Sequence, residues 1–246
     1  RMDTALLHSL RADLTAADFR ASAIGSLLGQ ADSARLRGVF VPASRVLDAR
    51  GRHPLHTLVR VFLLGESVSH ADLDAAFPSL QAEGALKLGL VAEVTAPEKA
   101  ASEPMLRAVL SLNPVDIVDS HLDAPAEWWL ISDLDDQLRR GPARPDHVMG
   151  VGGATRSLIA QAAPGAVARA LDLGTGCGVV ALHLALRSEH VVATDASERA
   201  LTLAAANAEL NELADRIEFR AGSLFEPVAG ETFDLVLTNP PFVITP

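Results

Sequence analysis

The sequence has very little cysteine and no long apolar run. Cys177 is its only cysteine, which excludes a disulfide framework within the chain and a cysteine-based zinc site. No apolar run reaches the roughly 20 residues that span a bilayer, and the N-terminus lacks the layout of a signal peptide. We therefore expect a cytoplasmic protein with no membrane partner, and the residues predict no metal site.

Lysine is scarce as well, and the overall charge is acidic. The chain has 19 arginines and 2 lysines, and its net charge is -10. This charge argues against indiscriminate binding to nucleic acid. Six arginines nevertheless occur between residues 35 and 60 against the single acid Asp48, and they form either a solvated surface or a local phosphate-contacting patch. These arginines are Arg35, Arg37, Arg45, Arg50, Arg52 and Arg60.

The chain is long enough for two modest domains. Its 246 residues could form one large domain or two smaller ones with separate cores. Residues 139–146 combine two prolines, a glycine and charged residues, a composition typical of a linker. We predict a mostly helical N-terminal domain over 1–140, with a possible role in substrate recognition, and a second domain over 141–246.

The first 140 residues have mainly helical periodicity. Apolar residues at helical spacing predict helices over 5–11, 16–28, 33–38, 56–64, 69–77 and 79–88. Ser69 is a candidate N-cap. Extended segments follow at 105–112 and 128–132. The last three of these helices, followed by a strand pair, have the order of a winged helix. No diagnostic motif accompanies this pattern.

The second half alternates strands and helices. Strands are predicted over 168–173, 190–195, 217–221 and 233–238, and helices over 178–186 and 197–210. The strands are apolar without polar alternation, as in sheets that are covered on both faces. Alternating strands and helices predict an α/β fold with a parallel, doubly wound sheet.

The strongest local motif is a glycine-rich turn after the first of these strands. Asp172 is followed by glycines at 174, 176 and 178, which allow a sharp turn and close approach to a ligand. A dinucleotide fingerprint would need a glycine at 179, where this chain has valine. The acidic Asp172 would favour an ammonium group over a phosphate. The turn therefore predicts a cofactor with a cationic amino-acid end.

Two further elements follow later strands. Asp195 ends the second strand, where a carboxylate can accept hydrogen bonds from both hydroxyls of a ribose. Residues 239–242, Asn-Pro-Pro-Phe, follow the fourth strand and would face the same crevice. The Asn239 amide and the Pro240 carbonyl would be fixed acceptors for the hydrogens of an amino nitrogen, with the backbone locked by Pro240 and Pro241. Phe242 could stack on the planar group that bears this nitrogen.

Residues 168–246 resemble class I S-adenosylmethionine-dependent methyltransferases, with a Rossmann-like fold. The motif at 239–242 is similar to the (N/D/S)-P-P-(Y/F/W) motif of the amino-methylating branch. The closest look-alike is the "methyltransferase small" group, which includes rRNA guanine-N2 and, more distantly, release-factor glutamine methyltransferases. The resemblance covers about a third of the chain.

The resemblance implies a set of cofactor-binding residues. Asp172 and the turn at 174–178 would hold the methionine end of S-adenosylmethionine, and Asp195 the ribose. Ser223 stands where the family usually has an aspartate that binds the adenine amine. The implied cofactor-binding residues are Asp172, Gly174, Thr175, Gly176, Gly178, Asp195, Ala196, Ser223, Leu224 and Asn239.

These features predict in-line transfer of a methyl group to an amino nitrogen, in which alignment provides most of the acceleration. Asn239, Pro240, Pro241 and Phe242 are the candidate catalytic residues. We rank an RNA base first as acceptor, a protein glutamine second and a small molecule third. One alternative is a DNA-binding regulator whose cofactor domain senses a ligand. The other, a nicotinamide oxidoreductase, fails on the glycine spacing.

The predicted sheet is incomplete. Class I methyltransferase sheets have seven strands, and this sequence supplies four. The last of them would be an apolar, unpaired edge. We therefore expect the residues to be a fragment of a longer protein, or a disordered or cleaved C-terminal part to be missing; completion of the sheet by a partner chain is the alternative.

Overall fold

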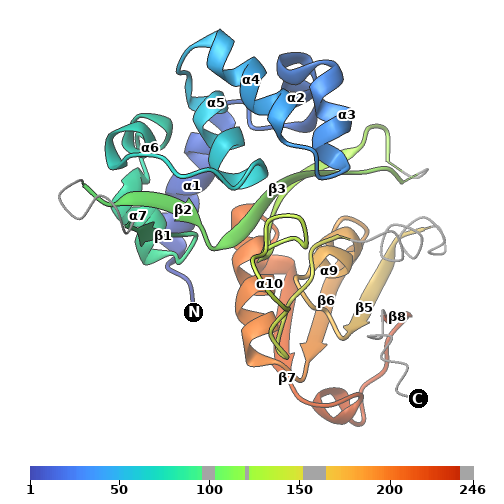
Figure 1. Cartoon of the computed structure of the whole chain (residues 1–246). Helices are drawn as coiled ribbons and strands as arrows, with labels where there is room; N and C mark the ends of the chain where they lie inside the picture. Colours follow the sequence, from blue (N-terminus) through green and yellow to red (C-terminus); the bar gives the residue numbers. More distant parts are fainter. Residues whose placement is uncertain (96–102, 120–121, 152–164, 239–246) are drawn as a thin grey trace, which may run out of the picture. The chain divides into compact units, whose positions relative to one another are not determined.

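The computed structural model describes residues 1–95, 103–119, 122–151 and 165–238 (Figure 1). Contacts divide the chain into two compact units. The N-unit comprises Met2–Val115 and Ile131–Ala143, and the C-unit comprises Asp116–Leu130 and the residues from Arg144 onward, with Arg1. A division into 1–140 and 141–246 would instead assign Asp116–Leu130 to the first domain. In the described ranges, no helix is long and apolar enough to cross a membrane.

The N-unit is mainly helical, as predicted, but two elements differ. The predicted helix 16–28 is interrupted at Asp18, whose φ of 53° ends α1. Helix α4 is not among the predicted helices, and its Pro42 lies in the first turn, where proline is tolerated. The helices are α1 Thr4–Ala16, α2 Ala21–Leu28, α3 Gln30–Leu36, α4 Val41–Arg50, α5 Pro54–Leu58, the π-helical η1 Val59–Leu63, α6 His70–Ala76 and α7 Gln81–Lys87.

The last helices of the N-unit lead into a short β-hairpin. Strands β1 (Val91–Val94) and β2 (Met105–Ala108) pair antiparallel, and Val68 forms a bridge to Leu106. Helices followed by an antiparallel pair is the predicted winged-helix order, but only β2 lies in a predicted segment, 105–112, and its partner β1 was not predicted. The predicted segment 128–132 lies in β4 (Ala126–Asp133), which pairs with β3 (Leu110–Ile117) in a separate two-stranded sheet. The four-residue β1 is too short to show a clear periodicity.

Two carboxylates occupy the N-terminus of α7. Asp13 of α1 has 2% of its surface exposed and accepts hydrogen bonds from the backbone N–H groups of Ser79 and Leu80, at 3.0 and 2.7 Å. Asp74 accepts one from the N–H of Ala82 at 2.7 Å. These contacts satisfy N–H groups that a helix start otherwise leaves without partners. Asp13 therefore joins α1 to α7 across a buried boundary.

Replacing Asp13 with alanine is expected to destabilise the protein by about 2–4 kcal/mol, because buried N–H groups lose a charged acceptor. Urea unfolding followed by helical circular dichroism measures the change. Asp3→Ala is the control: Asp3 caps the exposed start of α1 through the N–H of Leu6, and its loss should cost only about 1 kcal/mol. Equal losses in the two variants would contradict the joining role of Asp13.

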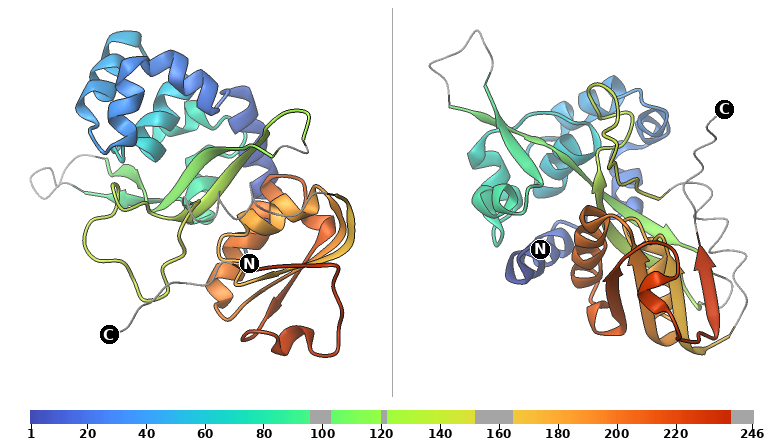
Figure 2. Two further views of the ribbon diagram at one scale, coloured as in Figure 1. Left: turned by 90° about the vertical axis from the view of Figure 1, so that its right-hand side faces the viewer. Right: turned by 90° about the horizontal axis from the view of Figure 1, so that it is seen from below.

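The C-unit has the predicted α/β fold. Its four strands are parallel in the order β7-β6-β5-β8 (Figures 1 and 2). Helices α9 and α10 connect successive strands and pack against β5, β6 and β7. The elements are β5 Val167–Leu173, α9 Val179–Ala185, β6 Ser188–Asp195, α10 Glu198–Leu210, the 3-10 turn η2 Ala214–Arg216, β7 Ile217–Ala221, the 3-10 turn η3 Glu226–Val228 and β8 Leu235–Thr238.

The segment Asp116–Leu130, here called the arm, joins the C-unit through two buried polar contacts. The Asp119 carboxylate lies 2.6 Å from Nε2 of His183 on α9, and both side chains are buried. The side-chain amide of Asn211 accepts from the backbone N–H of Trp129 at 3.0 Å and donates to its carbonyl at 2.8 Å. Asn211 thus pairs with the arm as a neighbouring strand would. These contacts explain why the arm belongs with α9 and α10 despite its distance from them in sequence.

Candidate cofactor and active site

The predicted cofactor-binding residues of the C-unit meet at the carboxyl ends of the strands. Leu173 at the end of β5 lies beside Thr194, the residue before Asp195 at the end of β6. The backbone N–H of Gly222, just after β7, donates to the Asp195 carbonyl at 3.0 Å. Three separate loops therefore start at one edge of the sheet, which is where ligands bind in open α/β folds.

The turn at 174–178 needs its glycines for two different reasons. Gly176 has a φ of 55°, and a Cβ there would meet no atom within 4 Å. Glycine is therefore needed at 176 for its backbone conformation and not for lack of space, because the space beside it is open. Gly178 has a φ of 90°, and a Cβ would lie 2.9 Å from the Cβ of Ala204 on α10. A side chain at 178 would push the turn away from α10.

Asp172 is a buried carboxyl group beneath this turn. Only 1% of its surface is exposed, and Oδ2 accepts a hydrogen bond from the Thr175 hydroxyl at 2.8 Å. The pKa of Asp172 is raised to about 7, chiefly by burial and also by the nearby Asp195, while hydrogen bonding from the Thr175 hydroxyl and from the backbone N–H of Ala181 opposes the shift. Oδ1 is buried and has no hydrogen-bond partner in the described part of the chain. A cationic ligand would satisfy this oxygen and stabilise the ionised carboxylate.

Asp195 connects the turn to the start of α10. Its Oδ2 accepts from the backbone N–H of Gly176 at 3.0 Å, and its Oδ1 from that of Ser197 at 2.9 Å. Each carboxylate oxygen has a second lone pair for another donor. The half-buried carboxylate thus orders the turn and remains a suitable acceptor for hydroxyl groups, while its neighbour Ala196 is exposed.

The loop after β7 contributes exposed residues to the same edge. Ser223 and Leu224 follow Gly222, and Leu224 is 79% exposed with a φ of 47°. A positive φ is unusual for leucine. The structure therefore brings Ser223 and Leu224 to the predicted edge through the backbone, and their roles toward a cofactor stay predictions.

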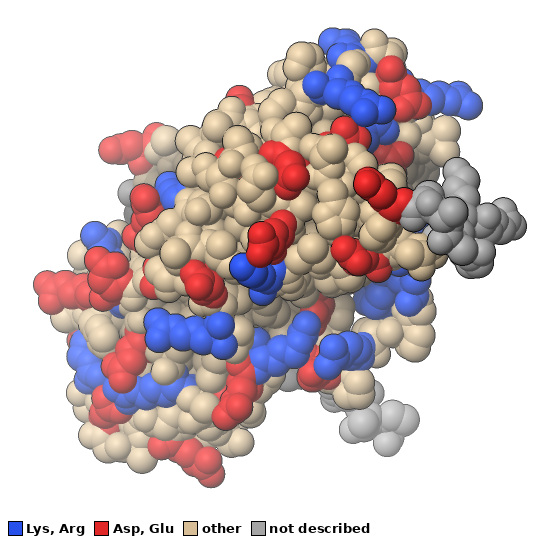
Figure 3. All heavy atoms as spheres, turned by 90° about the vertical axis from the view of Figure 1, so that its left-hand side faces the viewer, with Lys and Arg blue, Asp and Glu red and all other residues tan. Residues whose placement is uncertain are grey.

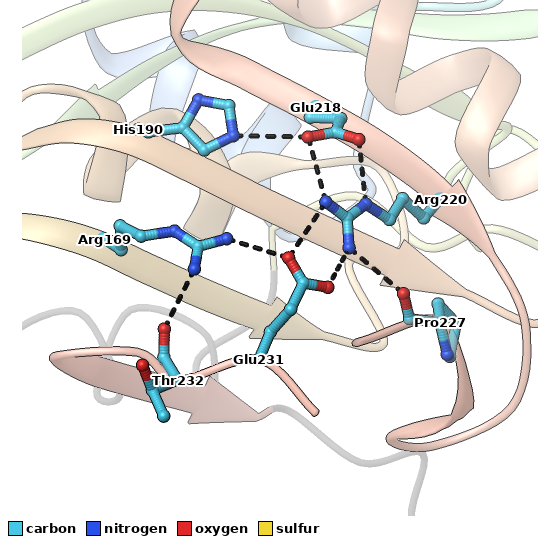
Figure 4. A network of polar contacts seen from close by, with 7 residues as sticks. All are labelled: Arg169, His190, Glu218, Arg220, Pro227, Glu231 and Thr232. Atoms are coloured by element: carbon cyan, nitrogen blue, oxygen red, sulfur yellow. Dashed lines mark hydrogen bonds and ion pairs between the residues drawn. The ribbon is translucent and has the colours of Figure 1, made fainter. Parts of the chain in front are cut away.

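A network of ion pairs anchors the loop after β7 to the strands (Figure 4). Glu231 accepts from Arg169 of β5 at 2.9 Å and also pairs with Arg220 of β7. Arg220 additionally donates to Glu218 at 2.8 Å and to the Pro227 carbonyl at 3.1 Å. Hydrogen bonds from Arg220 lower the pKa of both glutamates. The network fixes the return path of the chain from β7 to β8.

Cys177 lies within the glycine turn but is not a reactive thiol. Its side chain is buried, and burial raises the pKa of the thiol to about 11. A thiol with such a pKa is almost entirely protonated at neutral pH and is a weak nucleophile. Cys177 therefore acts as a small residue that fits the turn.

Sequence reasoning did not assign a role to Asn207 of α10. This side chain is completely buried, and its Nδ2 donates to the Cys177 carbonyl at 2.8 Å. Asparagine is a weak helix former. Two asparagines four residues apart in an alanine-rich segment therefore indicate that these side chains make specific hydrogen bonds. The structure shows that one of them, Asn207, contacts the glycine turn.

The candidate catalytic residues Asn239, Pro240, Pro241 and Phe242 lie outside the described residues. Thr238, the last residue of β8, lies beside Leu173, one position before the glycine turn. The described strand therefore ends at the edge where Asp172 and Asp195 lie. The roles of residues 239–242 stay predictions.

Comparison with known families assigns the C-terminal part of the chain. Residues 150–245 match the Methyltransferase small domain. This region is a class I methyltransferase domain. Residues 16–102 match a family described as a domain of unknown function (DUF7059).

Curated relatives match short stretches of this chain. The release factor glutamine methyltransferase of Xylella fastidiosa is 44% identical over 77 residues, which cover 30% of this chain and 28% of that protein. The protein of the same name from Gloeobacter violaceus is 44% identical over 78 residues, covering 31% and 27%. The chain thus spans less than a third of the length of these relatives.

A solved structure, the ribosomal protein L11 methylase of Lactobacillus delbrueckii subsp. bulgaricus, is 31% identical and covers 40% of this chain and 51% of its own. Its TM-score is 0.34, so the assignment of the domain rests on the sequence matches.

Proposed function

We propose that this protein binds S-adenosylmethionine and transfers its methyl group to the nitrogen of a planar amide or amine. The observation that supports this most directly is the buried Oδ1 of Asp172, which lacks a partner in the described residues beneath an open glycine turn. An ammonium group would give this oxygen a donor, and S-adenosylmethionine has one. When bound, it supplies a methyl group on a positively charged sulfur.

The same residues disfavour a dinucleotide. A pyrophosphate would bring negative charge toward Asp172 and Asp195, two carboxyl groups that already repel one another. The glycine spacing also departs from the dinucleotide fingerprint at Val179. Asp195 instead suits a ribose, because a carboxylate accepts hydrogen bonds from two neighbouring hydroxyls.

The acceptor nitrogen would be oriented by residues 239–242. An amide nitrogen is a poor nucleophile because its lone pair is delocalised. If the Asn239 side chain and the Pro240 carbonyl accept its hydrogens, the lone pair turns toward the methyl group. Phe242 would hold the planar group by stacking. Binding and alignment then account for the acceleration, without a strong general base.

For the acceptor we now place a protein glutamine side chain ahead of an RNA base. Relatives with 41–44% identity over 76–77 residues are named release factor glutamine methyltransferases. The N-unit offers little for a phosphate backbone at α7, since Asp13 and Asp74 occupy its N-terminus. Acidic and basic side chains are also interspersed on the face seen in Figure 3. Single-sign surfaces are more usual in nucleic-acid-binding proteins.

RNA stays the second candidate because three arginines are available for it. Arg37, Arg45 and Arg50 are exposed and form no ion pair with the described residues. The other three arginines of this stretch are paired: Arg35 with Asp32, Arg52 with Asp72, and Arg60 with Asp48 and Glu66. Only half of the predicted basic stretch is therefore free for phosphate contacts.

Calorimetric titration with S-adenosylmethionine and with NAD tests the cofactor. We expect binding of the first and none of the second; the reverse result would refute the proposal. Transfer from radiolabelled S-adenosylmethionine is then compared between purified release factors and fractionated RNA. Label in a release-factor glutamine supports the protein glutamine as acceptor. Label in RNA overturns that choice in favour of an RNA base.

A further inference from the structure

The glycine turn of the C-unit is held from behind by α10. Ala204 contacts the turn at Gly178, and Asn207, three residues later on the same helix face, donates to the Cys177 carbonyl at 2.8 Å. Asn207 has no exposed surface, so water cannot replace it without a rearrangement. A buried amide in a helix interior needs such a partner to offset its loss of solvation.

This hydrogen bond fixes one particular peptide group. The peptide unit between Cys177 and Gly178 has its carbonyl held by Asn207, and its N–H donates to the Thr175 carbonyl at 2.9 Å. Gly178, with a φ of 90°, is a residue at which the backbone can readily adopt another orientation. Asn207 therefore adds a second anchor, at the carbonyl, to a peptide group that is otherwise held only through its N–H.

Apart from the Gly178 N–H bond to the Thr175 carbonyl, the remaining contacts of the turn act on other groups. The Thr175 hydroxyl donates to Asp172, and the N–H of Gly176 donates to Asp195. Both contacts hold the first half of the turn to the strand ends. In the second half, the carbonyl of Cys177 depends on Asn207.

We infer that Asn207 is a positioning residue of the cofactor site, which keeps the glycine turn in its binding conformation through the Cys177 carbonyl. This inference rests on the proposed S-adenosylmethionine site. If only a fraction of the molecules has the turn correctly formed, the apparent affinity falls by that fraction. Once the cofactor is bound, it selects the correct turn, so catalysis at saturation is unaffected.

The chain offers a matched control one helical turn further on. Asn211, the C-cap residue of α10, is also buried, and it makes comparable hydrogen bonds, but with the arm residue Trp129 rather than with the turn. Its side chain also donates to the Asn207 carbonyl at 2.8 Å, which is a contact within the helix. Loss of either asparagine should lower stability similarly, whereas only Asn207 should affect the turn.

The test compares Asn207→Leu with Asn211→Leu in the full chain. We expect Asn207→Leu to raise the dissociation constant and the KM for S-adenosylmethionine about tenfold, with kcat at saturation within twofold of wild type. Asn211→Leu should leave the dissociation constant within twofold. If both variants weaken binding equally, or neither does, the inference is overturned. Should the leucine variants fail to fold, Asn207→Asp and Asn211→Asp replace them, since aspartate keeps the size and removes the donor.

Hydrogen–deuterium exchange on the cofactor-free protein provides a second readout. Peptides that span residues 173–179 should exchange about tenfold faster in the Asn207 variant than in the Asn211 variant. Equal exchange in the two would refute the positioning role. A wild-type protein that fails to bind S-adenosylmethionine would instead refute the proposed function, and the exchange comparison would still show whether Asn207 orders the turn.

Discussion

Replacing Asp172 with asparagine is expected to stabilise the cofactor-free protein at pH 8 and to remove most of its affinity for S-adenosylmethionine. The carboxyl group is buried, and its pKa is raised to about 7 from an ordinary value of 3.8. The folded state thus holds a proton that the unfolded state releases above about pH 4. This stabilisation is fully present below pH 4, is lost as the pH rises toward 7, and leaves a constant penalty above it.

Asparagine has nearly the same shape and never ionises, so it avoids the penalty. The shift of about three pKa units corresponds to at most about 4 kcal/mol, and Asp172→Asn should recover part of it. Melting temperatures of the two proteins should be similar at pH 4 and diverge up to about pH 7.5. Thr175→Val is the control, since it removes the hydroxyl that favours the charged form and should enlarge the penalty. A difference between Asp172→Asn and wild type that is independent of pH would contradict the assignment.

The affinity for S-adenosylmethionine should rise with pH, whereas the stability of the cofactor-free protein should fall. A cationic ligand binds the ionised carboxylate, so wild-type affinity is expected to fall about tenfold for each pH unit below 7. Asp172→Asn loses the charge-assisted contact and should bind about 100-fold more weakly at pH 8. Calorimetry from pH 5.5 to 8 measures both effects. Binding by Asp172→Asn within threefold of wild type would exclude an ammonium group at this carboxylate.

Replacing Asn239 with alanine is expected to abolish transfer and to spare cofactor binding. The variant loses the side-chain acceptor that would orient the acceptor nitrogen, and a misaligned nucleophile costs about 100-fold or more in kcat. Radiolabel transfer gives kcat, and calorimetry gives the dissociation constant for S-adenosylmethionine, which should stay within threefold. Mass spectrometry of the wild-type product should find the methyl group on nitrogen.

Asn239→Asp is the matched control for this experiment. Aspartate keeps an acceptor oxygen and occurs at the same position in the resembling motif, so it should retain more activity than alanine. Transfer that survives Asn239→Ala would refute the orienting role. Equal loss of binding and transfer would instead assign Asn239 to the cofactor alone.

The strands of the C-unit could be predicted closely because buried parallel strands are continuous apolar runs. Strand β5, expected over 168–173, lies at Val167–Leu173, and β7 has both of its predicted ends, Ile217 and Ala221. The positions of Asp172 and Asp195 follow from those strand ends. The buried state of Asp172 and its raised pKa could not be predicted, because they depend on how α9 and the ends of neighbouring strands pack around it.

Elements that depend on distant partners were missed. Asn211 and Trp129 lie 82 residues apart, and His183 and Asp119 lie 64 apart. No periodicity in either segment indicates that they meet. The hairpin β1–β2 was misassigned for a similar reason, since a four-residue strand is recognisable mainly through its partner.

The arm makes the C-unit discontinuous in sequence, and this limits how the protein can be divided. A fragment that begins at Arg144 would contain the strands and the glycine turn but would lack Asp119 and Trp129. His183 and Asn211 would then lose the buried partners described above, and polar groups in the packed faces of α9 and α10 would be left unsatisfied. The methyltransferase domain therefore cannot be exchanged between proteins by cutting the chain at the predicted linker, residues 139–146. Any recombination that preserves it must carry the β3–β4 hairpin as well, and with it a piece of the helical half of the chain.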